Sequence, residues 1–215
     1  MKHWALFVSG RYPAAHHDFY RRLAAGKRLV AVDGGYRFLK RLDMVPDLLI
    51  GDFDSLAGIP KGLPNSVEIL RFPTAKDKTD THLALDYCLK RGASKIDIVD
   101  PGCGEIDHLI GNVMLLTLGA GTSVSPPPRI SIRSHRHEIR YVADGAMSFV
   151  DAVGDGLSIV PLSKKLVLDC LGVEYPARSL GLSRGDTNSL RNWITARRAT
   201  VRVRGAALVI RLYHR

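Results

Sequence analysis

The chain has 215 residues, of which 46% are hydrophobic and 24% are charged, and its formal net charge is +10. These values are ordinary for a globular protein, and no apolar run approaches the roughly 20 residues of a membrane-spanning helix, so we expect no membrane segment. The three cysteines, Cys88, Cys103 and Cys170, are far apart and show no CxxC spacing, which disfavours a disulfide framework or a zinc site and favours a reducing, cytoplasmic location.

The first 120 residues alternate between short aliphatic runs and longer amphipathic stretches. Strands are predicted over residues 5–8, 29–32, 47–50, 67–70 and 96–99, and helices over residues 16–25, 36–42, 79–91 and 107–118. Strands that alternate with helices form βαβ units around a parallel sheet. The continuously apolar strands agree with this, because both faces of such a sheet are covered. Thr79 and Asp107 are suited to cap two of the helices.

The sequence changes character after residue 119. The segment 119–128 combines two glycines with three consecutive prolines, which neither a helix nor the interior of a sheet accommodates. Short strand-like runs then follow over residues 130–133, 138–142, 146–150, 157–161, 166–171, 199–203 and 207–212, a pattern typical of an antiparallel β-sandwich. We therefore expect an α/β domain over residues 1–122, a linker over 123–128 and a β-sandwich domain over 129–215.

Acidic residues recur just after the predicted strands of the first domain. The carboxyl ends of parallel strands lie along one edge of the sheet, which is where open α/β sheets bind ligands. We therefore expect these carboxylates to gather at that edge. They are Asp33, Asp52, Asp54, Asp77, Asp80 and Asp107.

Carboxylates that gather at one edge repel each other unless a counter-charge is present. Magnesium supplies such a charge, since it prefers oxygen ligands and binds a few carboxylates together with substrate phosphates. Lys76 and Lys78 could neutralise phosphate oxygens, and the helix starts at Thr79 and Asp107 offer free N–H groups. Taken singly, each motif also fits an ordinary turn, solvated loop or helix terminus. Their occurrence at successive strand ends favours a site for phosphoryl-type transfer.

At these residues the chain resembles the thiamine pyrophosphokinase family. The family carries an Asp-Gly-Gly turn, a Gly-Asp-Phe-Asp-Ser loop, a Lys-Asp-x-Thr-Asp segment and a Gly-Gly-Arg-x-Asp-His loop. The corresponding segments here are 33–35, 51–55, 76–80 and 102–108, in the same order. In the second half, residues 172–176 and 185–188 resemble more weakly the family's Gly-Leu-Lys-Tyr-Pro turn and its Gly-x-Ser-Asn motif.

The resemblance implies a nucleotide-binding α/β domain followed by a β-sandwich, and a homodimer that binds thiamine where the sandwich of one chain meets the catalytic domain of the other. It implies attack of the thiamine hydroxyl on the β-phosphorus of ATP, with release of AMP. The implied magnesium ligands are Asp33, Asp52, Asp54 and Asp80, and the implied catalytic residues are Asp52, Asp54, Asp80 and Asp107. The residues implied to contact ATP or the metal-bound water are Asp33, Gly34, Lys76, Asp77, Thr79, Gly104, Asp107, His108 and Asn112. The residues implied to contact thiamine are Tyr175, Thr187 and Asn188.

Three positions depart from the family pattern. Glu105 replaces the arginine of the Gly-Gly-Arg loop, while His82 and Ser189 stand where the family commonly has glutamate. The loss of a phosphate-binding cation is expected to weaken ATP binding. Two alternatives therefore stay open: diphosphate transfer to another hydroxymethyl heterocycle such as a pterin, and a catalytically weak nucleotide-sensing or RNA-binding relative. The basic C-terminal segment lacks the interleaved aromatic residues that single-strand binders use, which disfavours nucleic acid as a partner.

Overall fold

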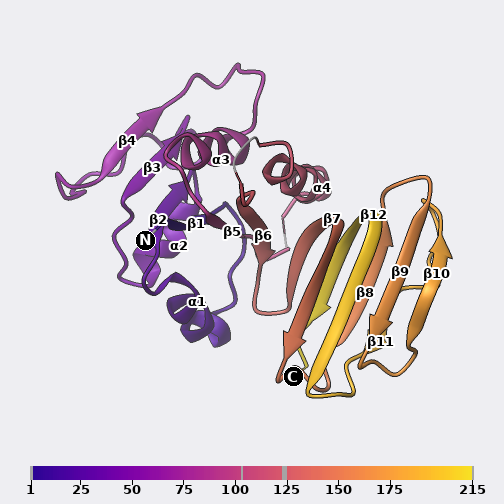
Figure 1. Ribbon diagram of the computed structural model, residues 1–215. Helices are drawn as coiled ribbons and strands as arrows, with labels where there is room; N and C mark the ends of the chain where they lie inside the picture. The colour runs from indigo at the N-terminus through magenta and orange to yellow at the C-terminus, as the bar shows by residue number, and fades with distance from the viewer. Residues whose placement is uncertain (1, 103, 123–124, 215) are drawn as a thin grey trace. The chain divides into compact units, whose positions relative to one another are not determined.

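The computed structural model describes residues 2–102, 104–122 and 125–214 (Figure 1). Cys103 and residues 123 and 124 of the expected linker lie outside the described part. The chain divides into two compact units, Met1–His135 and Arg136–Arg215. Each unit has its own hydrophobic core.

The first unit contains a parallel sheet with the strand order β4-β3-β2-β1-β5-β6. All five strands predicted before residue 120 are present. The sixth strand had been expected in the second domain, but it pairs in parallel with β5, with Ser131 opposite Asp97. The strands are β1 (His3–Phe7), β2 (Arg28–Val32), β3 (Leu48–Gly51), β4 (Glu68–Arg71), β5 (Lys95–Val99) and β6 (Arg129–Arg133).

Helices connect the strands as the alternating pattern predicted. Thr79 caps α3, because its hydroxyl oxygen accepts a hydrogen bond from the His82 N–H at 3.2 Å. The expectation that Asp107 caps the next helix is wrong: α4 begins at Ile106, with Glu105 at the cap position. The helices are α1 (His17–Ala24), α2 (Gly35–Arg41), α3 (Asp80–Lys90) and α4 (Ile106–Leu115), with short 3-10 helices η1 (Ala14–His16) and η2 (Leu116–Gly119).

Buried side chains fix the helices to the sheet. The rings of Tyr12 and of Phe38 in α2 stack with their centroids 3.8 Å apart. The ring of Tyr20 in α1 contacts the Phe38 ring edge-on. α3 packs against β1, β2 and β3 and buries Ala84 and Leu85. Each such side chain contributes about 1.5–3 kcal/mol by leaving water. Because the helices are held firmly, the loops at the strand ends start from fixed positions.

The second unit is an antiparallel β-sandwich, as predicted. Its long strands β7 (His137–Val150) and β12 (Arg198–Leu212) pair along their length. The first part of β12 also pairs with β9 (Leu166–Leu171), and the last part pairs with β8 (Gly156–Pro161). Two further strands, β10 (Ala177–Leu182) and β11 (Asn192–Trp193), were not predicted, and they pair antiparallel with β9 and β8 respectively.

A β-bulge explains why the sequence suggested four strands where two long ones exist. The pairing of β7 with β12 shifts in register between Val203 and Ala206. Asp144 has a φ of 43° and Gly205 a φ of 105°, and the Asp144 carboxylate accepts a hydrogen bond from the Gly205 N–H at 2.7 Å. Residues that resembled turn signals therefore bend two continuous strands instead of ending them.

None of the helices in the described residues is long and apolar enough to cross a membrane.

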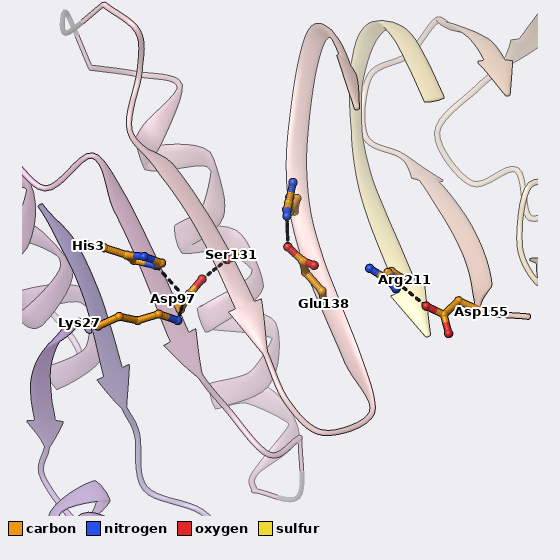
Figure 2. A network of polar contacts seen from close by, with 8 residues as sticks. His3, Lys27, Asp97, Ser131, Glu138, Asp155 and Arg211 are labelled. Carbon is orange, nitrogen blue, oxygen red and sulfur yellow. Dashed lines mark hydrogen bonds and ion pairs between the residues drawn. The ribbon is translucent and has the colours of Figure 1, made fainter. Parts of the chain in front are cut away.

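A buried polar network links three strands of the first unit (Figure 2). The Asp97 carboxylate in β5 is 1% exposed and accepts hydrogen bonds from Lys27 at 2.6 Å and Ser131 at 2.6 Å. His3 lies 2.9 Å from the same carboxylate. Burial alone would raise the pKa of Asp97, but the bonds from Lys27 and Ser131 hold that pKa below its ordinary value. In the second unit, Asp155 accepts a comparable bond from Arg211 at 2.5 Å.

Asp97→Asn is expected to lower the free energy of unfolding by about 3–5 kcal/mol at pH 7, because it leaves the Lys27 ammonium without its buried counter-charge. Since the folded-state pKa of Asp97 is depressed, the stability that its charge contributes is present above the unfolded pKa of about 4 and is lost as pH falls through the folded value. Urea denaturation between pH 3 and pH 8 checks this, with Ser131→Ala as a milder control. A loss below about 1 kcal/mol at pH 7 would contradict the role of this network.

Candidate functional site

Asp33 lies directly after β2, at the carboxyl edge of the parallel sheet. Its backbone N–H donates to the Ile50 carbonyl at 2.8 Å, and its φ is 44°. The chain then turns into α2 through two glycines. A Cβ on Gly35 would lie 1.8 Å from the Phe7 carbonyl oxygen, so this position accepts only glycine without movement of β1. The Asp-Gly-Gly motif therefore brings α2 close to the sheet and leaves Asp33 at the edge.

The loop after β3 places two more aspartates beside Asp33. Phe53 is 1% exposed and has a φ of 66°, so its ring anchors the loop in the core while the neighbouring side chains stay outside. The Asp54 N–H donates to Asp52 Oδ1 at 3.3 Å. One carboxylate oxygen each from Asp33, Asp52 and Asp54 lie within 4.8 Å of one another.

Lys76 connects this group to the start of α3. Its ammonium nitrogen lies 3.0 Å from Asp52 Oδ2 and 3.1 Å from Asp80 Oδ1, and its side chain is only 13% exposed. Asp80 is the first residue of α3. The structure thus brings together Asp33, Asp52, Asp54 and Asp80 with one lysine, as the strand-end argument predicted.

The pKa values of these groups follow from their surroundings. The hydrogen bond from Lys76 lowers the pKa of Asp52. Burial raises the pKa of Asp80, and the negative charges of Asp52 and Asp33 raise it further against the effect of Lys76. Burial would lower the pKa of Lys76, but its bonds to Asp52 and Asp80 raise it, so the lysine stays charged. The site carries more negative than positive charge.

The geometry suits a small divalent cation. Magnesium bonds oxygen at about 2.0–2.1 Å in an octahedron, so its ligand atoms lie about 3 to 4 Å apart. One oxygen each from Asp33, Asp52 and Asp54 already lie within 4.8 Å of one another, close to that spacing. Asp33 Oδ1 is buried without a hydrogen-bond partner among the residues that the structure describes. A buried carboxylate oxygen of this kind is costly unless a cation contacts it.

A cavity of about 560 Å³ opens beside the carboxylates, within the size range of small-molecule sites. The start of α3 borders it, so the free N–H groups of the first helical turn lie at its wall. Of the residues predicted for the nucleotide and the metal, Gly34, Asp52, Lys76, Asp77 and Asp107 are not among its lining. Its lining includes Asp33, Asp54, Thr79, Asp80, Asp100, Gly104, Glu105, His108 and Asn112.

Asp100 is a lining residue that the sequence analysis missed. It follows β5 and is 6% exposed. Its carboxylate accepts hydrogen bonds from Asn112 Nδ2 at 2.9 Å and from the Gly102 N–H at 2.8 Å. Asn112 was predicted to contact the cofactor, and Asp100 is what holds its amide in place. Asp100 could have been predicted from the sequence, because it also comes directly after a strand.

The start of α4 carries a second acidic group. Oxygen or nitrogen atoms of Glu105, Asp107 and His108 lie within 4.8 Å of one another, and all three residues are exposed. The Asp107 carboxylate accepts a hydrogen bond from the His108 N–H at 2.8 Å. Asp107 is therefore grouped with Glu105 and His108, apart from the cluster around Lys76. Asp77 is exposed as well.

The second unit has an apolar cavity of about 190 Å³ of its own. Of the residues that the resemblance implied for thiamine, Tyr175 and Asn188 line this cavity, whereas Thr187 does not. Asn192, which the sequence analysis did not select, accepts from the Tyr175 N–H at 3.0 Å and donates to the Tyr175 carbonyl at 2.8 Å. This pair of bonds fixes the turn that carries Tyr175, a residue that remains 67% exposed.

Comparisons with known proteins agree on one family. Residues 20–124 match the family model described as thiamin pyrophosphokinase, catalytic domain. A thiamine pyrophosphokinase from Bacillus subtilis (strain 168) is 27% identical over 190 residues, which cover 85% of this chain and 86% of that protein.

Solved structures are similar over both units. A crystal structure of thiamine pyrophosphokinase from Bacillus subtilis superposes with a TM-score of 0.84 at 25% identity, covering 99% of this chain and 100% of that one. The corresponding structure from Geobacillus thermodenitrificans gives a TM-score of 0.81 at 26% identity, covering 99% and 98%. A thiamin pyrophosphokinase from Candida albicans, at 14% identity and a TM-score of 0.75, shares the fold, covering 99% of this chain and 89% of that one.

Lys76→Ala is expected to destabilise the protein by about 1–3 kcal/mol at pH 7 without divalent cations, because Asp52 and Asp80 lose their counter-charge. The change would raise the folded-state pKa values of both carboxylates. The variant would therefore be destabilised at pH values above them and recover as pH falls and the carboxylates become protonated. Denaturation curves in EDTA at pH 7 and pH 4 measure both effects. Equal losses at the two pH values would show that Lys76 acts through packing alone.

Proposed function

This chain belongs to the thiamine pyrophosphokinase family, and we propose that it transfers a diphosphate group from ATP to the hydroxyl group of thiamine, giving thiamine diphosphate and AMP. The observation that carries the proposal is the meeting of Asp33, Asp52, Asp54 and Asp80 beside a 560 Å³ cavity at the carboxyl edge of the sheet. Transfer of this kind depends on positioning and charge stabilisation more than on covalent work by the protein.

In the proposed reaction, a bond forms between the thiamine hydroxyl oxygen and the β-phosphorus of ATP. The bond from that phosphorus to the oxygen that bridges the α- and β-phosphates breaks, AMP leaves with that oxygen, and the hydroxyl proton passes to solvent. Asp33, Asp52, Asp54 and Asp80 would hold magnesium, which supplies positive charge for the phosphate oxygens. The free N–H groups at the start of α3 stabilise the same oxygens, and Lys76 provides a further positive charge beside Asp52 and Asp80. Asp100 keeps the Asn112 amide at the cavity wall.

We assign the acceptor to the apolar cavity of the second unit. Tyr175 and Asn188 line it, and Leu190 and Trp193 leave further apolar surface exposed nearby. Exposed apolar surface of this kind supports a second proposal, that the chain works as a homodimer. Cys88 and Cys170 are free and buried, which fits a reducing compartment, so we propose that the enzyme acts in the cytoplasm.

Release of AMP from ATP and magnesium, with and without thiamine, tests the proposed reaction. Thiamine-dependent AMP, with thiamine diphosphate as the second product, is the expected result. If AMP is released only when a hydroxymethyl pterin is added, the acceptor is a pterin and not thiamine. Salt-sensitive binding of RNA without turnover of ATP would show that the protein is an RNA-binding protein and not an enzyme.

Asp54→Asn is expected to lower kcat by about a hundredfold or more with the fold intact, since it removes a proposed metal ligand from an exposed loop. Steady-state AMP release and thermal melting measure the two effects. Asp18→Asn, at an exposed aspartate that pairs with Arg21 in α1, is the matched control and should keep its activity. Activity near that of the wild type in Asp54→Asn would refute the assigned role.

Glu105→Arg is expected to tighten the binding of ATP by roughly three- to tenfold, because Glu105 lines the cavity and repels the phosphates that an arginine would bind. Glu105→Gln removes only the negative charge and should give an intermediate effect. The KM for ATP and the Kd of a non-hydrolysable analogue are the measurements. Unchanged or weaker binding in Glu105→Arg would show that this loop no longer touches phosphate.

A further inference from the structure

The second unit carries a basic groove on the outer face of one of its sheets. The groove encloses about 490 Å³ and lies over strands β10, β9, β12 and β7. None of its residues belongs to the apolar cavity that we assign to the acceptor. The lining residues are Ala146, Met147, Ser148, Asp169, Leu171, Arg178, Arg198, Thr200, Val201 and Arg202.

The alternation of side chains along β12 creates this groove. Ala199, Val201 and Val203 point into the sandwich core and are fully buried. The alternate residues, Arg198 and Arg202 among them, point to the other face. Thr200 lies between these two arginines and is paired with Ser148 of β7. Small side chains thus form the floor, and the arginines, four residues or about 13 Å apart along the strand, rise on either side of it.

Two arginines of the groove make no ion pair in the described part of the chain, although Arg202 stands opposite Asp169 where β12 pairs with β9. Arg178 and Arg202 have no carboxylate within 4.0 Å among the residues that the structure describes, and both are exposed. Arg198 contacts the Ser148 hydroxyl at 3.5 Å. The acidic side chain in the lining, Asp169, already accepts from the Ser179 N–H at 2.7 Å and lies 3.8 Å from Arg204. The groove therefore keeps an excess of positive charge.

We infer that this groove binds a small anion that carries a diphosphate group. A guanidinium donates two parallel hydrogen bonds to phosphate oxygens, and three of them around one small-residue floor match the charge of two linked phosphates. The volume is within the range of small-molecule sites. This inference does not depend on the proposed transferase activity, because it rests on residues of the second unit alone.

Other occupants fit less well. A single-stranded nucleic acid is bound through aromatic side chains that stack on the bases, and the lining contains none. A second copy of the chain would have to present an acidic surface, and the chain as a whole has 31 basic against 21 acidic residues, so its exposed acidic group at Glu105 and Asp107 is the small surface it could offer. The groove fits an anion whose charge is concentrated in a small volume.

Calorimetric titration of the full chain with inorganic pyrophosphate, in EDTA and low salt, tests the inference. Without a divalent cation, the acidic cluster of the first unit repels pyrophosphate, so binding there does not obscure the result. Binding by the wild type is expected, and Arg178→Ala/Arg202→Ala should weaken it at least about tenfold. The control Lys164→Ala/Lys165→Ala removes the same charge from exposed lysines of the same unit and should change the Kd less than about threefold.

Two further arms identify the source of the diphosphate. ADP or thiamine diphosphate binding at least tenfold tighter than pyrophosphate, with that gain lost in Arg178→Ala/Arg202→Ala, would support the inference and show that the organic part adds contacts in the groove. Equal Kd values would support recognition of the diphosphate alone. Absence of pyrophosphate binding, or an equal loss in the lysine control, would overturn the inference. Binding of an oligonucleotide in place of pyrophosphate would also overturn it. The same holds if sedimentation shows that a change of oligomeric state is the only effect of the arginine variant.

Discussion

The candidate site depends on the electrostatic balance between four aspartates and one lysine. Asp33, Asp52, Asp54 and Asp80 come from three separate segments of the chain, and their mutual repulsion opposes the fold that collects them. Lys76 offsets part of this cost by pairing with Asp52 and Asp80. Asp33 Oδ1 remains buried without a partner among the described residues. A site of this kind is stable enough to form and retains affinity for a further positive charge.

Much of this arrangement could be predicted because it follows from topology. Apolar runs identified five parallel strands, and a parallel sheet brings the residues after each strand to one edge. Asp33, Asp52, Asp54 and Asp80 were predicted on that basis, and the structure places them together. The same reasoning applied to Asp100 would have found it, but Asp100 was overlooked beside the better-known motif that starts at Gly102. The position of Asp107 was harder to predict, because a difference of one residue in where α4 begins changes the direction of the Asp107 side chain.

The second unit was harder to predict, for reasons that lie in its strands. Half of β10 is exposed, and Ser179 within it has a φ of 50°, so the strand lacks the alternation of buried and exposed residues that marks a strand in a sequence. β11 has only two residues. Asp144 and Gly205 resembled turn residues but form a bulge within long strands. Strand β6 was assigned to the wrong unit because its apolar residues do not reveal that Ser131 bonds to Asp97 of β5.

The measurement that tests the central claim most directly is the position of a divalent cation. Crystals grown with manganese, thiamine and a non-hydrolysable ATP analogue would reveal the metal by anomalous diffraction. The account predicts a peak in direct contact with carboxylate oxygens of Asp33, Asp52, Asp54 or Asp80 and with phosphate oxygens of the analogue, at a little over 2 Å. A peak only at Glu105, Asp107 and His108, or none at the sheet edge with the analogue bound, would contradict it.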